Sequence, residues 1–191
     1  MRKRLQAMPT VTRRIVMGDK TRIFGALAPL YRRAGFWPRP VKQGTKACPF
    51  KNWNVPDPER KLGELDNWLE AYGNWGIGLM LGSPFPDGTR LAAVDIDRDE
   101  YVRVGHALLR NPPSGRIGAK GIAYFVRMRG DEKYRPLKVK GENGVKVGEF
   151  LGDKRFLVLP PTIHPDTKQA YRWVGRPLLQ IDYRELPIIE A

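Results

Sequence analysis

The apolar positions of this chain recur with two periods, which predict both helices and strands. Helical spacing occurs over residues 20–33 and again over residues 58–72. Gly35 and Gly73 follow these two segments, and glycine is a common helix terminator. A third, short helix is predicted over residues 100–109. The apolar stripes that we expect to be buried are Ile23, Leu27 and Leu30 in the first helix and Leu62, Leu65, Trp68 and Leu69 in the second.

Shorter apolar runs, bounded by Gly, Pro and Asp, predict strands between these helices. The runs cover residues 36–41, 75–81, 91–97, 121–128, 145–150, 156–159 and 171–174. Helices and strands therefore follow one another without an internal sequence repeat, which indicates a mixed α/β or α+β fold. We expect residues 1–18 to form a flexible basic arm and residues 19–191 to form a single domain.

The charge balance adds information about partners. The chain has 34 Lys and Arg against 20 Asp and Glu residues, a formal net charge of +14, which favours a polyanionic partner. Cys48 is the only cysteine, so the sequence excludes an internal disulfide and a Cys-based zinc site and fits a reducing, cytoplasmic location. No apolar run approaches the ~20 residues of a membrane span, so we expect no membrane partner.

An acidic pair ends the apolar run of residues 91–97. Asp95 and Asp97 are separated by one residue, and in a strand such side chains point to the same face. Two adjacent carboxylates repel each other unless a cation lies between them, and Mg²⁺ or Mn²⁺ suits their oxygen ligands. The pair is therefore a candidate metal site, although a strand that ends in two solvated acids gives the same pattern.

A third carboxylate, Glu149, lies among apolar neighbours in the predicted strand 145–150. Burying an acid costs free energy unless the acid is paired or binds a metal. With Asp95 and Asp97 it would complete a cluster for one or two Mg²⁺ ions, which can activate a hydroxyl nucleophile and neutralise a leaving pyrophosphate. An exposed strand position and an ion pair with a nearby lysine are the alternatives.

Two further segments carry residues suited to anions. Residues 114–127 contain three glycines together with Arg116, Lys120 and Arg127, which could approach a triphosphate or a nucleic-acid strand, although the P-loop pattern is absent. In residues 159–167, prolines on both sides hold His164 in a defined direction. From there His164 could contact a nucleotide with the help of Thr162, although a lone histidine is commonly structural.

Taken together, these segments resemble the primase-polymerase domain of the archaeo-eukaryotic primase superfamily, in the bifunctional DNA primase/polymerase form of phages, plasmids and mobile elements. The resemblance runs from about residue 20 to residue 173. Many relatives carry a histidine in the second motif, whereas residues 118–125 have none, so Lys120 or Arg127 would replace it. The matching motifs are Tyr31-Arg32-Arg33-Ala34-Gly35-Phe36, Lys46-x-x-Pro49-x-x-x-Trp53, Trp75-Gly76-Ile77-Gly78-Leu79, Val94-Asp95-Ile96-Asp97, Gly148-Glu149-Phe150-Leu151-Gly152 and Pro160-Pro161-Thr162-Ile163-His164-Pro165.

The resemblance implies an RRM-like catalytic sheet flanked by helices, with a smaller N-terminal α/β element. It implies nucleotidyl transfer from NTPs or dNTPs on a single-stranded DNA template, for primer synthesis or extension. Asp95, Asp97 and Glu149 would hold Mg²⁺ or Mn²⁺, and the cationic residues with His164 would hold the triphosphate. The sequence lacks a helicase P-loop, so a replicative helicase would be a partner in the same or a separate chain, in a prokaryotic cytoplasm.

Two other classes of function remain as alternatives. A replication-initiation nuclease can also have an RRM-like fold, but it needs a paired-histidine metal site and a nucleophilic tyrosine, and His106 and His164 are far apart in the sequence. A non-catalytic single-stranded DNA or origin-binding module would be equally basic, because neutralising phosphates releases counterions whatever the chemistry. Metal and nucleotide binding would distinguish an enzyme from such a module.

Overall fold

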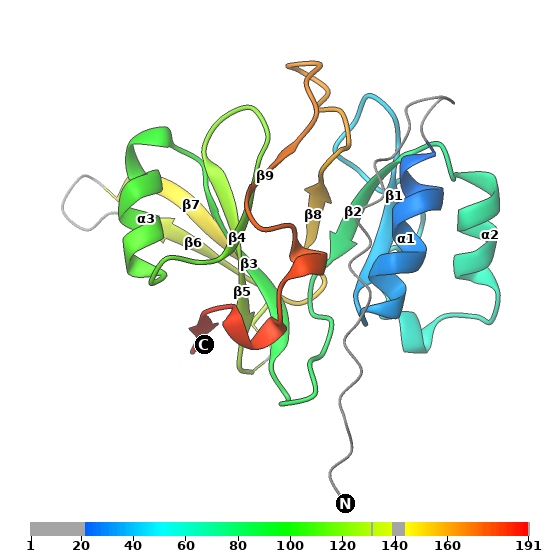
Figure 1. Ribbon diagram of the computed structural model, residues 1–191, viewed down its shortest axis with the longest axis horizontal. Helices are drawn as coiled ribbons and strands as arrows, with labels where there is room; N and C mark the ends of the chain where they lie inside the picture. The colour runs from blue at the N-terminus through cyan, green and yellow to red at the C-terminus, as the bar shows by residue number, and fades with distance from the viewer. Residues whose placement is uncertain (1–21, 131, 139–143, 191) are drawn as a thin grey trace, which may run out of the picture.

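The computed structural model describes residues 22–130, 132–138 and 144–190, and it forms two sheets that lie side by side (Figure 1). These residues form three α-helices and ten strands, so the predicted mixed α+β class is confirmed. The expected basic arm, residues 1–18, lies outside the described residues. Among the helices that the structure describes, none is long and apolar enough to cross a membrane.

The smaller sheet is antiparallel and has the strand order β1-β2-β8. Helix α1 packs against β1 and β2, and α2 packs against α1 (Figure 1). The resemblance implied a smaller N-terminal α/β element, and the structure adds to it β8, from the C-terminal half of the chain. The chain therefore crosses between the two sheets three times, after β2, before β8 and after β8. The bounds are α1 Ile23–Arg33, β1 Trp37–Val41, α2 Glu64–Ala71, β2 Gly76–Met80 and β8 Phe156–Leu159.

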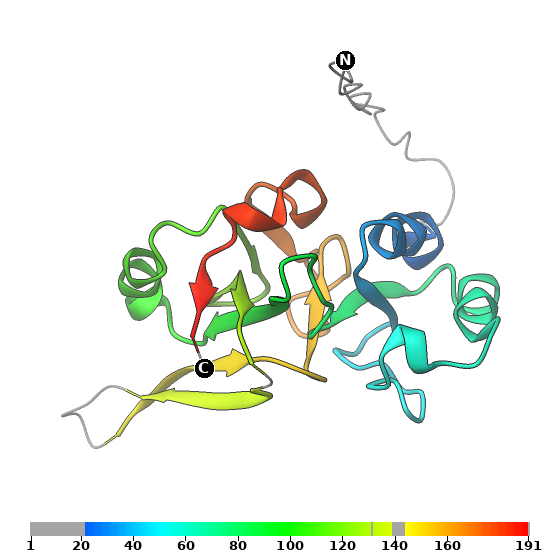
Figure 2. The ribbon, with the colours of Figure 1, turned by 90° about the horizontal axis from the view of Figure 1, so that it is seen from below.

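The larger sheet has the order β6-β7-β3-β5-β4-β9, with antiparallel neighbours, and β10 pairs in parallel with β5. Figure 2 shows β6 and β7 as a long hairpin at one edge, away from α1 and α2. The sequence analysis missed β4, β6 and β10: β6 is mostly exposed and polar, β4 begins in a Ser-Gly pair, and β10 is very short. The bounds are β3 Arg90–Ile96, α3 Val102–Leu108, β4 Ser114–Ile117, β5 Ile122–Met128, β6 Tyr134–Lys138, β7 Lys146–Leu151, β9 Arg172–Gly175 and β10 Ile188–Ile189.

The helices differ from the predicted ones in length and in buried face. The predicted helix over 58–72 begins only at Glu64, because Gly63 adopts a left-handed conformation with φ of +80° that interrupts the helical path. Leu62, expected in the apolar stripe, is therefore fully exposed. In α1 the stripe is rotated, and Leu30 is 44% exposed. The residues of α1 that are buried are Phe24, Ala28 and Tyr31.

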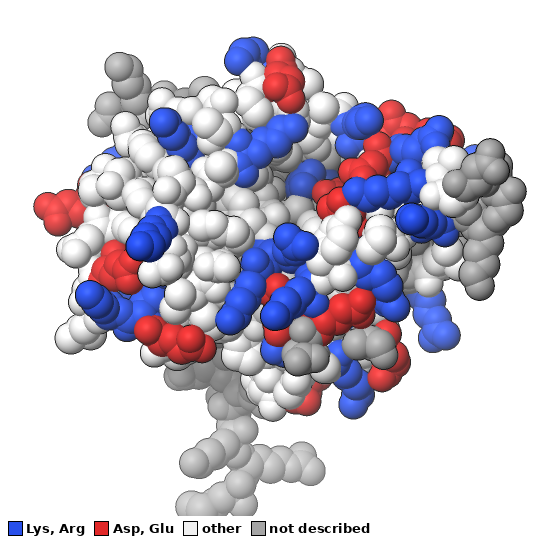
Figure 3. Space-filling model, turned by 180° about the vertical axis from the view of Figure 1, so that it is seen from behind, with Lys and Arg blue, Asp and Glu red and all other residues white. Residues whose placement is uncertain are grey.

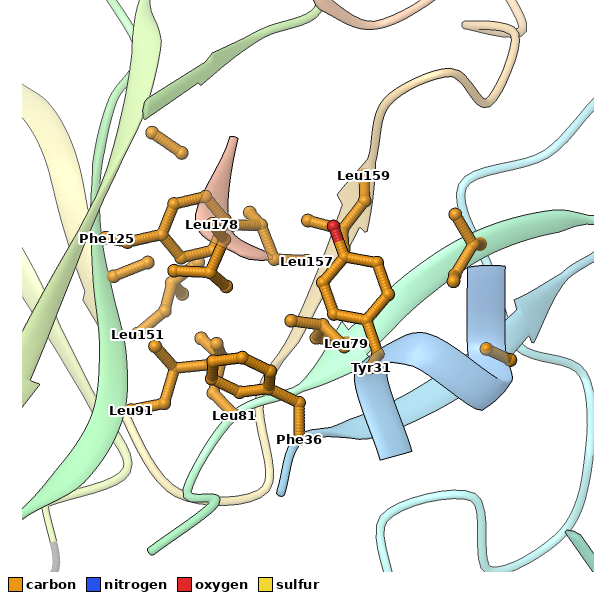
Figure 4. Close-up of a cluster of buried hydrophobic side chains, with 14 of the residues drawn as sticks. Tyr31, Phe36, Leu79, Leu81, Leu91, Phe125, Leu151, Leu157, Leu159 and Leu178 are labelled. Carbon is orange, nitrogen blue, oxygen red and sulfur yellow. The ribbon is translucent and has the colours of Figure 1, made fainter. Parts of the chain in front are cut away.

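One hydrophobic core joins the two sheets and determines which face of the larger sheet meets the smaller one. Leu79 and Leu157 from the smaller sheet pack in the same cluster as Leu91 and Phe125 from the larger sheet (Figure 4). We call this face of the larger sheet the inner face. The opposite, outer face packs in a second core with the residues of α3 and its flanks. Since side chains alternate along a strand, Asp95 lies on the inner face with Leu91.

Candidate active site

The two strands that carry the predicted acids are neighbours, and Asp95 is the direct cross-strand partner of Glu149. On its other side β3 pairs with β5, where Ala123 lies opposite Asp95. Strand β4 follows, with Arg116 opposite Ala123. Because directly opposed residues share one face of a sheet, the inner face carries a row of Glu149, Asp95, Ala123 and Arg116, which we call the acid–arginine row.

Arg116 reaches Asp95 across the strand that separates them. The intervening Ala123 offers only a methyl group, and the Arg116 Nη2 atom lies 3.6 Å from Asp95 Oδ2. The Arg116 guanidinium also lies 5.1 Å from the centre of the Tyr171 ring. Its Nε atom is buried and has no hydrogen-bond partner among the described residues. Arg116 thus has hydrogen-bonding capacity left for an anionic ligand.

Asp95 lies in an environment that disfavours its charge. Burial raises the pKa of the Asp95 carboxyl above its ordinary value, the charges of Asp97 and Glu149 raise it further, and Arg116 opposes them. The Asp97 N–H donates to the Val147 carbonyl at 2.9 Å, so β3 is held against β7 up to that residue. A cation placed between these carboxylates would relieve their repulsion.

Glu149 makes the ion pair that the sequence left open as an alternative. Its Oε1 atom is in contact with the Lys146 ammonium group and accepts a hydrogen bond of 3.1 Å from the Tyr134 hydroxyl. In the described part of the chain, no three His, Cys, Asp or Glu side chains converge on one point as in a finished metal site. The donor set still fits Mg²⁺ or Mn²⁺, because the carboxylate oxygens come from adjacent strands. The ion pairs of Arg116 with Asp95 and of Lys146 with Glu149 show that these carboxylates attract positive charge. Coordination by all three acids requires the Glu149 side chain to turn away from Lys146.

The loop after β8 brings His164 to the arginine end of the row. The His164 ring is only 3% exposed and lies 5.2 Å from the Tyr171 ring, which Arg116 also contacts. Its Nδ1 atom accepts from the N–H groups of Asp166 at 3.2 Å and Thr167 at 3.3 Å. The neutral ring therefore carries its proton on Nε2, where it can act as a donor.

The match to a known family decides between the functional classes. The family model described as the N-terminal domain of bifunctional DNA primase/polymerases matches residues 28–189. The chain belongs to this family. The matched region includes both sheets and the whole acid–arginine row, and the activity of the family is DNA priming and polymerisation, a nucleotidyl transfer. No curated protein matches the chain.

Two residues that the sequence predicted for the nucleotide site, Thr162 and Arg127, have other partners in the fold. The Thr162 hydroxyl accepts from the Ile77 N–H at 2.7 Å and donates to the Ile77 carbonyl at 3.0 Å, so it fastens the β8–β9 loop to β2. Arg127 is buried and binds Asp87 Oδ2 at 2.6 Å and two carbonyl groups of the C-terminal segment. Lys120 is exposed in the turn between β4 and β5. The predicted Gly-rich anion loop is thus a β-hairpin that contributes Arg116.

Both histidines of the chain lie among the described residues, and they do not form the paired-histidine site of a replication-initiation nuclease. His106 lies on α3, and its ring is 5.6 Å from that of Tyr124, on the outer face of the larger sheet. His164 lies with Arg116 on the other side of that sheet. The two histidines of the chain therefore cannot ligate one metal ion, which agrees with membership of the primase/polymerase family.

Sequence reasoning missed Tyr134, the residue of β6 that contacts Glu149. The segment Tyr134–Lys138 lacks the apolar pattern that predicts a strand, since it is mostly exposed and contains a proline. No signal in the sequence would have placed the Tyr134 hydroxyl at the acid–arginine row. Tyr171, whose ring lies beside both Arg116 and His164, was placed in the predicted strand 171–174 and given no role at the site.

The contact between β3 and β7 can be tested at Gly148. A methyl group at this position would lie 2.2 Å from the Asp95 carbonyl oxygen, a backbone atom that cannot move without separating the two acidic strands. We expect Gly148→Ala to lower the free energy of unfolding by about 1–3 kcal/mol in a urea titration and to lower nucleotide incorporation. The control is Gly105→Ala in α3, whose methyl would meet only the end of the Ile96 side chain at 3.1 Å. Equal behaviour of the two variants would contradict this view of the β3–β7 contact.

His164 predicts a loss of stability in mild acid. Burial lowers the pKa of the His164 imidazole below its ordinary value, and Lys46 acts in the same direction. The folded protein then binds this proton less tightly than the unfolded chain, so stability is lost as the pH falls through the ordinary histidine pKa of about 6.5. In urea titrations at about pH 7.5 and pH 5.5, His164→Asn should lose less stability on acidification than the wild type. Identical losses of stability in the two proteins would show that protonation of His164 does not cause the loss in mild acid.

Proposed function

We propose that the protein catalyses template-directed nucleotidyl transfer on single-stranded DNA, from NTPs or dNTPs. A primer 3′-hydroxyl, or that of a first nucleotide, attacks the α-phosphorus of the incoming nucleotide. The bond from O3′ to this phosphorus forms, its bond to the bridging oxygen breaks, pyrophosphate leaves, and the hydroxyl proton passes to water. The observation that carries the proposal is the acid–arginine row, in which paired carboxylates and a cation share one face in a chain of the primase/polymerase family.

Asp95, Asp97 and Glu149 are the residues that would hold the metal ions. Mg²⁺ or Mn²⁺ bound there would supply charge neutralisation for the nucleophile and the leaving pyrophosphate. The residues themselves provide oxygen ligands on two neighbouring strands. Burial and the neighbouring acids raise the pKa of the Asp95 carboxyl although Arg116 opposes them, so the negative charge of Asp95 is not fully compensated within the protein. This environment supports the assignment of the acids as metal ligands.

Arg116 and His164 would bind the triphosphate. Arg116 presents a buried Nε without a partner, and His164 presents the Nε2 proton, both beside Tyr171. Lys120, exposed at the tip of the β4–β5 hairpin, would add a third cation. These groups take the role for which many relatives use a histidine of the second motif.

The surface supports a nucleic-acid partner. Figure 3 shows a face that is hollowed near its middle, with Lys and Arg side chains in and around the hollow and acidic side chains on one wall. Such an arrangement attracts a phosphate backbone while acids remain available for metal ions. The proposal includes a cytoplasmic location and a replicative helicase as a further partner, in line with the class of replication protein that the sequence resembles.

The direct test is incorporation of labelled NTPs or dNTPs on single-stranded DNA templates, with and without a primer, in Mg²⁺ and in Mn²⁺. We expect products whose composition follows the template and whose formation stops when the metal is chelated. Absence of products under all these conditions, together with tight binding of the same templates, would favour a non-catalytic binding module instead.

A further inference from the structure

The geometry of the proposed reaction indicates the side from which the primer arrives. In nucleotidyl transfer the attacking and leaving oxygens lie roughly in line, on opposite sides of the reacting phosphorus. Arg116 and His164 would hold the leaving pyrophosphate on the β4 side of Asp95. The attacking 3′-hydroxyl must then come from the other side, where Glu149 is followed by β6.

An exposed aromatic side chain borders Glu149 on that side. Tyr134, on β6, donates its hydroxyl to Glu149 Oε1 at 3.1 Å, and the residue remains 36% exposed. The guanidinium of Arg155 lies 4.6 Å from the centre of the Tyr134 ring. Arg155 is exposed and directly precedes β8, where the chain crosses to the smaller sheet. An aromatic ring and a cation thus lie next to the acids, at the junction of the two sheets.

We propose that Tyr134 and Arg155 bind the 3′-terminal nucleotide of the primer strand, with the Tyr134 ring stacked on the base and Arg155 on the adjoining phosphate. Aromatic rings bind bases by stacking without regard to sequence, and arginine binds phosphate through several N–H groups, so the pair suits a terminus of changing sequence. The inference rests on the proposed function. It adds the position of the primer, on the opposite side of Asp95 from Arg116.

Primer-extension kinetics test this assignment, because they separate the KM for a primed template from the KM for the incoming nucleotide. We expect Tyr134→Ala and Arg155→Gln each to raise the KM for the primed template roughly tenfold and to change the nucleotide KM less than about twofold. Tyr134→Phe keeps the ring and loses only the hydroxyl bond to Glu149, so its primer KM should stay near that of the wild type. The control is Arg135→Ala, since Arg135 lies over Phe150 on the outer face and pairs with Glu132.

A binding measurement without metal or nucleotide distinguishes failure of this inference from failure of the proposed function. Fluorescence anisotropy of a labelled primer–template with a recessed 3′ end should show weaker binding to Tyr134→Ala and Arg155→Gln than to Arg135→Ala. Unchanged binding and unchanged primer KM in both variants would overturn the inference and leave the proposed function intact. A nucleotide KM that rises instead would also overturn it, because it would place the pair on the triphosphate side. If the wild type incorporates no nucleotide, the proposed function fails, and the anisotropy result alone decides whether the pair binds DNA.

Discussion

Asp95→Asn is expected to lower nucleotide incorporation by about 10³-fold, because a bound metal ion supplies several kcal/mol of transition-state stabilisation and each 1.36 kcal/mol is about tenfold in rate. Asp95 is the centre of the acid–arginine row, with Glu149 opposite it on β7 and Arg116 within 3.6 Å. The substitution keeps the size of the side chain and removes its charge. Steady-state primer extension in Mn²⁺ is the measurement.

The same variant is expected to be more stable than the wild type. Burial raises the pKa of the Asp95 carboxyl, so the folded protein binds this proton more tightly than the unfolded chain does. Stability is therefore lost as the pH rises through the folded pKa, and at neutral pH the ionised carboxylate is a net cost that asparagine removes. The melting temperature at neutral pH, without divalent ions, should rise by a few degrees.

The control for both effects is Glu100→Gln, which neutralises an exposed acid that pairs with Arg98. It should change neither incorporation nor melting temperature appreciably. An Asp95→Asn protein that incorporates nucleotides normally would refute the assignment of Asp95 to the metal site. Loss of activity with a lowered melting temperature would show instead that Asp95 is mainly a structural partner of Arg116.

Arg39→Met is expected to lower the free energy of unfolding by about 3–5 kcal/mol, because it removes the nearest counter-charge of a largely buried carboxylate, Asp57, and leaves it only Arg60 at 3.8 Å. The Arg39 side chain on β1 is fully buried and lies 2.6 Å from Asp57 Oδ1. It also donates to the carbonyl groups of Trp53 at 2.7 Å and Val55 at 2.9 Å. Arg39 therefore fastens the segment between β1 and α2 to the smaller sheet. Urea unfolding measures the loss.

Arg32→Met provides the matched control, since Arg32 also makes a close ion pair, 2.9 Å from Asp66, but Asp66 is 71% exposed. This variant should lose less than about 1 kcal/mol. The double variant Arg39→Met/Asp57→Asn should recover part of the stability that Arg39→Met loses, because the carboxylate that lost its nearest counter-charge is then neutral. If Arg39→Met lowers the free energy of unfolding no more than Arg32→Met does, the buried Arg39–Asp57 pair does not stabilise the fold more than an exposed pair.

The sequence predicted those elements whose apolar pattern is local. Strands β3, β5, β7 and β8 lie within two residues of the predicted bounds, because each buries apolar side chains that appear as a run in the sequence. Strand β6 shows no such run, since it is the exposed edge of the sheet. The helix over 58–72 was too long because its apolar spacing continued through Gly63, whose backbone conformation breaks it.

The candidate site was predictable in its residue types and only partly in its geometry. Asp95 and Glu149 could each be placed on a strand, but their pairing depends on the order of strands in the sheet, which no local pattern determines. Which arginine of residues 114–127 lies beside the acids also depends on the pairing of the strands. Arg116 and Arg127 belong to one basic segment, and only the register shows that Arg116 lies in the row while Arg127 lies further along β5, opposite Leu91.

Mn²⁺ binding measured by electron paramagnetic resonance tests the central claim most directly, because it detects the metal site without requiring turnover. The titration is made on the wild type, Asp95→Asn, Glu149→Gln and Glu100→Gln, with and without a nucleoside triphosphate. We predict that the wild type and Glu100→Gln bind Mn²⁺, more tightly when nucleotide is present, and that Asp95→Asn and Glu149→Gln bind it at least tenfold more weakly. Equal Mn²⁺ affinity in all four proteins, or no binding to the wild type even with nucleotide, would contradict a metal site at Asp95 and Glu149.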